Sequence, residues 1–207
     1  MTKFETIKTE YEKHSNAEKA AGMKKYMRDQ FEYYGIPTPE RKLLCRDFLK
    51  EEKKGKVVDR EFQYLADEYL ITMAKFLTFD DIPRIRKYVQ TKPWWDTIDF
   101  ICKVIGIIGE KDSRVDELML EWAVDEDIWV RRTAIEHQLG RKELTNTELL
   151  EKILVLNFGT TEFFINKAIG WTLRDYSKTD PEWVAAFIDR YHDKMSNLSI
   201  REGSKYI

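Results

Sequence analysis

The sequence is poor in glycine and proline. Nine glycines and five prolines make up about 7% of the 207 residues, whereas average proteins carry roughly 12%. So few turn-forming residues argue against a many-stranded sandwich or barrel. The hydrophobic fraction of 43% and the charged fraction of 35% are typical of amphipathic helices in a soluble protein and not of a disordered chain.

Other features are missing, and each absence excludes a class of protein. Only two cysteines, Cys45 and Cys102, are present, too few for a disulfide framework or a cysteine-rich metal site. The N-terminus lacks the pattern of a signal peptide, and no apolar run approaches the roughly 20 residues that cross a membrane. The three histidines have no metal-ligand spacing, and no phosphate-binding glycine-rich loop or Gly-x-Ser-x-Gly motif occurs. These absences predict a soluble, cytoplasmic protein without a metal.

A strong excess of basic charge is also missing. The net charge of -2 argues against a strongly basic nucleic-acid-binding protein. The charge is nevertheless uneven, because residues 128–142 alone have a local charge of +3. The average of -2 therefore leaves room for one basic face and one acidic face.

The apolar spacing is helical almost throughout and predicts an all-α fold in a single domain spanning 1–207. Start signals support this, because Thr145-Asn146-Thr147-Glu148 and Thr179-Asp180-Pro181-Glu182 both fit the capping box. The predicted helices lie at 3–14, 17–33, 39–53, 58–73, 81–91, 94–108, 112–124, 128–140, 147–157, 161–176, 181–193 and 199–206.

Three of these helices have the spacing of a repeat. Their starts, near Trp94, Ile128 and Thr161, lie about 34 residues apart. This spacing is typical of HEAT-like helical pairs stacked into a short curved solenoid, in which one row of helices lines a concave face.

The helix at 94–108 carries an aspartate beside a tryptophan. Asp99 lies one turn after Trp95, at the edge of an apolar stripe that includes Trp94. Asp99 is either part of a functional site or a residue that caps or pairs with a neighbouring helix. Asp96 is predicted to point toward solvent or the preceding loop, which makes it the weaker candidate. The stripe consists of Ile98, Ile101, Cys102, Ile105 and Ile108.

Arg132 falls in the middle of the apolar stripe of the next repeat helix, between Ile128 and Ile135. A buried guanidinium needs a carboxylate partner or an anionic ligand. One interpretation is a structural ion pair with Asp99, Asp96 or Glu162. The other is a phosphate contact, because the planar guanidinium matches phosphate oxygens.

In the third repeat helix, Trp171 lies off the apolar stripe. Helical spacing stacks it over Phe164 and next to Lys167. Such a tryptophan either packs against the next repeat or contacts a ligand.

Taken together, these segments resemble the AlkD family of DNA alkylation repair enzymes, which are HEAT-like-repeat DNA glycosylases. The Trp-Trp-Asp and Lys-Ala-Ile-Gly-Trp segments are the most specific, because a general HEAT scaffold needs neither. The matching segments, in the family's order, are Met23–Met27, Gly35–Arg41, Trp94–Asp99, Trp129–Ile135, Phe163–Trp171 and Leu173–Lys178.

The resemblance implies a monofunctional DNA glycosylase of base excision repair. Its substrates would be N3- or N7-alkylated purines in double-stranded DNA, attacked without base flipping. It also implies no cofactor, no membrane association and a monomer. The alternative is a non-catalytic HEAT-like module that binds DNA or a protein.

The resemblance also implies roles for individual residues. Asp99 matches the catalytic aspartate, and Trp95 and Trp171 match the two tryptophans that flank the lesion. Contacts with the DNA backbone or the cleft are implied for Arg132, Tyr26, Thr38, Lys42 and Arg174. Arg131 and Lys167 are added because they cluster with Arg132 and Arg174 on the presumed inner row of helices.

Three residues depart from the family pattern. Glu136 and Gly140 replace residues that are usually apolar or aromatic, and basic or polar. Glu136 lies one turn after Arg132, so it is able to pair with it and to weaken phosphate binding. Pro37 occupies a position that is polar in some relatives and touches DNA there.

Overall fold

The computed structural model of the chain describes residues 3–48 and 60–207. All secondary structure in these ranges is helical, with no strand, and this confirms the predicted all-α class. Two compact units are present, Met1–Tyr69 and Leu70–Ile207. A single domain spanning 1–207 stays a prediction.

The first unit has a small core built on Ile7, Tyr11 and Ile36. The second helix is shorter than predicted, because Arg28 and Asp29 both adopt left-handed backbone angles, with φ of 57° and 58°, and the chain leaves the helix there. The predicted helix limits at 53 and 58 lie outside the described residues. The helices are α1 (Lys3–Lys13), α2 (Ala17–Tyr26), α3 (Thr38–Phe48) and α4 (Arg60–Met73), of which α4 continues into the second unit.

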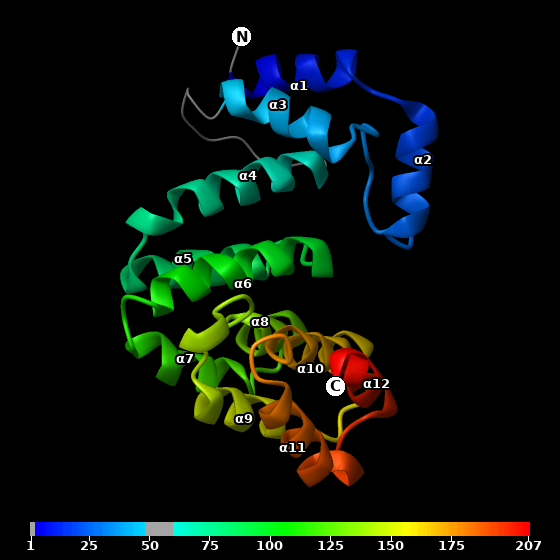
Figure 1. Cartoon of the computed structure of the whole chain (residues 1–207). Coiled ribbons are helices and arrows are strands. Elements are labelled where there is room, and N and C mark those ends of the chain that lie inside the picture. The colour runs from blue at the N-terminus through cyan, green and yellow to red at the C-terminus, as the bar shows by residue number, and fades with distance from the viewer. Residues whose placement is uncertain (1–2, 49–59) are drawn as a thin grey trace. The chain divides into compact units, whose positions relative to one another are not determined.

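The second unit consists of successive helical pairs. The second helices of three pairs begin at Trp95, Ile128 and Phe163, which confirms the predicted repeat spacing. They form one row in which α6 contacts α8, α8 contacts α10 and α10 contacts α12, while α7 contacts α9 in the other row (Figure 1). The helices are α5 (Ile82–Val89), α6 (Trp95–Gly109), α7 (Arg114–Trp122), α8 (Ile128–Glu136), α9 (Thr147–Leu156), α10 (Phe163–Tyr176), α11 (Pro181–Tyr191) and α12 (Asn197–Gly203).

Side-chain caps fix where several of these helices begin. The side chains of Asn146 and Asp180 accept hydrogen bonds from backbone N–H groups in the first turns of α9 and α11. The capping-box pattern predicts these caps one residue earlier, at Thr145 and Thr179. The caps lie at Asn146 and Asp180 instead because Asn and Asp are stronger N-cap residues than Thr. The start of α8 is fixed in the same way by Asp127.

Three aromatic residues at equivalent positions join the starts of α6, α8 and α10. Trp94, Trp129 and Phe164 lie 35 residues apart in the sequence. Their ring centroids are 5.6 Å apart for Trp94 and Trp129, 5.1 Å for Trp94 and Phe164, and 5.0 Å for Trp129 and Phe164. Aromatic pairs at such distances add stability beyond their buried area. The stack therefore sets the register of the helices that carry the candidate site.

The last helix of the row packs directly on α10. A Cβ atom at Gly170 would lie 2.6 Å from Glu202 Cβ and 2.9 Å from the Ser199 carbonyl oxygen. The Ser199 hydroxyl donates a hydrogen bond of 2.8 Å to the Asn166 carbonyl. Only glycine permits this approach, which brings Glu202 against α10.

Candidate active site

Arg132 is buried, with its side chain 3% exposed, and its guanidinium joins three helices. Nη2 donates to Asp99 Oδ1 on α6 at 2.8 Å, and Nη1 donates to the Phe164 carbonyl at the start of α10 at 2.8 Å. Nη2 also lies 2.7 Å from Oε1 of Glu136, one turn further along α8. The predicted ion pair between Arg132 and Asp99 is therefore present.

Asp99 is the most exposed of the three charged groups, at 18% of its side chain. Trp95, one turn earlier on α6, is half-buried against the hydrophobic core. Burial raises the pKa of the Asp99 carboxyl above its usual 3.8, and the charge of Arg132 opposes that shift. Asp99 thus pairs with a buried arginine and is partly exposed to solvent, one helical turn after Trp95.

Glu136 lies deeper than Asp99, with no exposure of its side chain. Burial raises the pKa of its carboxyl well above the usual range, Arg132 opposes that shift, and the charge of Asp99 adds to it. Both carboxyl groups contact the same guanidinium nitrogen, Arg132 Nη2, at 2.8 Å and 2.7 Å. The predicted pairing of Glu136 with Arg132 is confirmed.

The other predicted residues of these helices lie at different depths. Arg131 on α8 and Trp171 on α10 are half-buried. Asp96 is buried at 8% exposure, so a predicted orientation toward solvent is wrong, and the alternative, toward the preceding loop, stays a prediction. Helical periodicity indicates the face of a residue on its own helix but not what neighbouring segments place over that face.

A basic cluster surrounds Glu202 on α12. Its carboxylate pairs with Lys167 Nζ at 2.9 Å, Arg174 Nη1 at 2.9 Å and Lys205 Nζ at 3.0 Å. Lys167, followed by Lys205, lowers the pKa of Glu202 to about 2. One carboxylate against three cations leaves an excess of positive charge, and we call this group the Glu202 cluster.

Lys167 and Arg174 of this cluster are predicted from the sequence as DNA-binding residues, whereas Glu202 and Lys205 are not predicted. The available signal was the pattern of α12, where Glu202 shares the buried side of the helix with Ser199 and Gly203. A carboxylate among small buried residues requires a cationic partner.

Three predicted residues belong to the first unit. Tyr26 is the last residue of α2 and is 72% exposed. Thr38 is the first residue of α3 and is exposed. On the same helix, Lys42 pairs with Glu68, with 3.4 Å between Nζ and Oε1. The remaining predicted site residues all belong to the second unit.

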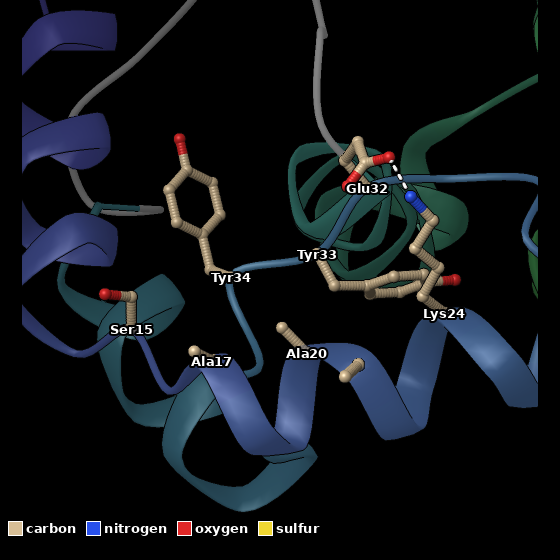
Figure 2. Close-up of a pocket in the computed structure, with 8 residues that line it drawn as sticks. Ser15, Ala17, Ala20, Lys24, Glu32, Tyr33 and Tyr34 are labelled. Carbon is tan, nitrogen blue, oxygen red and sulfur yellow. Dashed lines mark hydrogen bonds and ion pairs between the residues drawn. The ribbon is translucent and has the colours of Figure 1, made fainter.

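The first unit also contains a cavity of about 440 Å³ beside α2. Figure 2 shows Tyr33, Tyr34 and the ion pair between Lys24 and Glu32 at this cavity. None of the predicted site residues lines it. The lining residues are Ser15, Ala17, Ala20, Ala21, Lys24, Glu32, Tyr33 and Tyr34.

Two kinds of site are not found within 3–48 and 60–207. No helix there is both long enough and apolar enough to cross a membrane; the longest, α6, has 15 residues. Within the same ranges, no group of three or more His, Cys, Asp or Glu residues is placed to hold a metal ion. The groups that define the candidate site are the carboxyls of Asp99 and Glu136, the guanidinium of Arg132 and the indole of Trp95.

Comparison with known proteins identifies the family. The family described as DNA alkylation repair enzyme matches residues 7–207, so the chain belongs to that family. A search of curated proteins found no match.

Two solved structures are similar to this chain. One is described as a predicted DNA alkylation repair enzyme from Enterococcus faecalis, with a TM-score of 0.86 and 36% identity over 94% of this chain and 97% of that one. The other is the crystal structure of smu.31 from Streptococcus mutans UA159, with a TM-score of 0.60 and 16% identity over the whole of both chains. The second likeness concerns the fold alone. Both agree with the all-helical architecture.

Proposed function

We propose that this DNA alkylation repair enzyme is a monofunctional DNA glycosylase. It hydrolyses the N-glycosidic bond of N3- or N7-alkylated purines in duplex DNA. One observation carries the proposal: Asp99 is held by a buried arginine yet remains partly exposed beside Trp95. A carboxylate of this kind suits a reaction in which positive charge develops on a sugar.

The chemistry needs little help from a general acid. An N3- or N7-alkylated purine already carries positive charge, so it leaves as a neutral base with the electron pair of the broken bond. A water molecule forms the new bond to C1′ and releases a proton. The carboxylate of Asp99 stabilises the oxocarbenium character of the sugar and orients the water, as carboxylates do in glycoside hydrolysis.

The remaining residues bind and position the substrate in this proposal. The indoles of Trp95 and Trp171 contact the cationic base or the sugar through their faces, which attract positive charge. The lesion is reached without base flipping, so selection depends on its charge and lability more than on its shape. Arg132 is buried and paired, so it acts by holding Asp99. The DNA backbone is contacted by Arg131, Lys167, Arg174, Tyr26, Thr38 and Lys42.

The test is release of 7-methylguanine or 3-methyladenine from methylated duplex DNA. The Asp99→Asn variant keeps the size of the side chain and removes its charge, and we expect its rate of release to fall by about 100-fold. The matched control is Asp189→Asn, because Asp189 is an exposed aspartate on α11. It should release base at the rate of the unmodified protein.

Two outcomes would contradict the proposal. If the protein binds DNA but releases no base from heavily methylated DNA, it is a non-catalytic DNA-binding module. If Asp99→Asn and Asp189→Asn release base equally fast, Asp99 is not the catalytic carboxylate.

A further inference from the structure

The Arg132 site contains more acidic than basic groups. One guanidinium nitrogen, Arg132 Nη2, lies 2.8 Å from Asp99 and 2.7 Å from Glu136. If both carboxyls were ionised, the buried group would carry a net negative charge, and charge without full compensation is costly to bury. Two carboxyls in one buried space relieve that cost when one of them keeps its proton.

The geometry indicates which carboxyl keeps the proton. Glu136 is fully buried, whereas Asp99 is 18% exposed and is therefore better solvated as an anion. Apart from the contact with Arg132 Nη2, the carboxyl oxygens of Glu136 have no hydrogen-bond donor beside them. A neutral Glu136 is able to donate its own proton toward Asp99, because both carboxyls contact the same nitrogen, Arg132 Nη2. The raised pKa of Glu136 agrees with this arrangement.

The surrounding groups do not reverse this assignment. Arg132 is the cation in direct contact with both carboxyls, and the thiol of Cys102 is buried and has a raised pKa. The start of α10 contributes a backbone carbonyl, that of Phe164. The other ionisable groups that act on the two carboxyls are Asp96 and Lys103 of α6.

We propose that Glu136 is a positioning residue: as a neutral acid it donates a hydrogen bond to Asp99 and anchors Arg132 against that carboxylate. Asp99 then carries the single negative charge of the site, and its carboxylate is the part of the site that is partly exposed to solvent. The positioning role rests on the proposed glycosylase activity, whereas the position of the proton does not.

The first test measures base release under single-turnover conditions as a function of pH. Glu136→Gln keeps a neutral donor, so near neutrality it should stay within about threefold of the unmodified protein. Glu136→Ala removes both the donor and the anchor of Arg132, and we expect a loss of up to about 100-fold. At alkaline pH the unmodified protein should lose activity as Glu136 ionises, and Glu136→Gln should not.

The matched control is Glu143→Gln, which removes an exposed carboxyl from the short 3-10 helix Lys142–Leu144. It should reproduce the unmodified pH profile. If Glu136→Gln also reproduces that profile, or if it loses as much activity as Glu136→Ala, the positioning role is overturned.

The second test locates the proton without any measurement of activity. In protein labelled with ¹³C at its glutamate carboxyls, the Glu136 resonance should titrate well above the usual 4.5, and it should vanish in Glu136→Gln. Titration of Glu136 together with the exposed glutamates would overturn the assignment. If the resonance titrates high but the unmodified protein releases no base, the proposed function and the positioning role fail while the assignment of the proton stands.

Discussion

At the scale of single residues, burial determines which charges this protein can use. Asp99 and Glu136 pair with the same guanidinium, yet they differ in exposure and therefore in the form each carboxyl adopts. Glu202 shows the opposite case, because it pairs with three cations and two of them, Lys167 and Lys205, hold its pKa at about 2. A glutamate carboxyl is thus held as a neutral acid at Glu136 and as an anion at Glu202.

Replacement of Glu202 should change how the free energy of unfolding depends on pH. The folded state lowers the pKa of Glu202 from 4.5 to about 2, so its contribution is present above pH 4.5 and is lost as the pH falls toward 2. Glu202→Gln should lower the free energy of unfolding near neutrality by about 1–2 kcal/mol, a modest value because Lys167 and Lys205 are partly exposed.

Urea denaturation at several pH values measures this effect. The difference between the two proteins should shrink as the pH approaches 2. A difference that is the same at pH values above and below 4.5 would show that the ion pairs of Glu202 do not cause it.

Much of the Arg132 site could be predicted from the sequence at this scale. The apolar stripe of α8 predicts a buried arginine, and a buried arginine requires a carboxylate such as Asp99. The sequence could not predict that Asp96 is buried or that Glu202 collects three cations. Both depend on which segments pack together, and helical periodicity reports only the face that a residue occupies on its own helix.

At the scale of helices, the fold depends on starts, ends and close approaches. The spacing of Trp94, Ile128 and Thr161 predicts the row formed by α6, α8 and α10. The early end of α2 could not be predicted in the same way, because neither Arg28 nor Asp29 is a glycine that would mark a left-handed turn. The approach of α12 to α10 depends on a glycine whose role becomes visible only in three dimensions.

Substitution of Gly170 by alanine should show whether the packing of α12 on α10 affects the free energy of unfolding more than helix propensity does. In Gly170→Ala the new Cβ would overlap Glu202 Cβ at 2.6 Å and the Ser199 carbonyl oxygen at 2.9 Å. We expect a loss of about 1–3 kcal/mol in the free energy of unfolding, which exceeds the gain from alanine's better helix propensity.

Urea denaturation with a matched control checks this expectation. A Cβ at Gly22, inside α2, meets nothing within 4 Å. Gly22→Ala should therefore leave the protein equally stable or stabilise it by up to about 1 kcal/mol. Equal stability of the two variants would mean that α12 moves away from α10 at little cost.

At the scale of the whole molecule, the distribution of charge matters more than its sum. The chain has a net charge of -2, yet the Glu202 cluster leaves an excess of positive charge at one place on the second unit. An acidic molecule that binds DNA through a few local cations should bind more weakly than a basic relative and should be more sensitive to salt.

The salt dependence of DNA binding should distinguish an exposed cation, Lys205, from a buried and paired cation, Arg132. We expect the Glu202 cluster to contact DNA phosphates in the proposed complex. Lys205→Ala removes one exposed lysine of that cluster, so it should lower the slope of log affinity against log salt by about one. Arg132→Ala should leave the slope unchanged, since Arg132 is 3% exposed and already paired. A slope lowered by about one in Arg132→Ala would assign Arg132 to a phosphate instead.

The control for this measurement is Lys152→Ala on α9. Lys152 is exposed, and its removal changes the net charge by the same amount. An equal drop in slope for Lys152→Ala and Lys205→Ala would show that binding follows the total charge of the protein and not the Glu202 cluster.

The contact between Trp94, Trp129 and Phe164 also limits how this row can be redesigned. All three ring centroids lie within 5.6 Å of one another, so the rings form a closed triangle. A helical pair inserted between α6 and α8, or between α8 and α10, would separate one ring from the other two. Enlargement of the protein by added repeats would therefore keep this aromatic contact only where the repeats are added outside α6, α8 and α10.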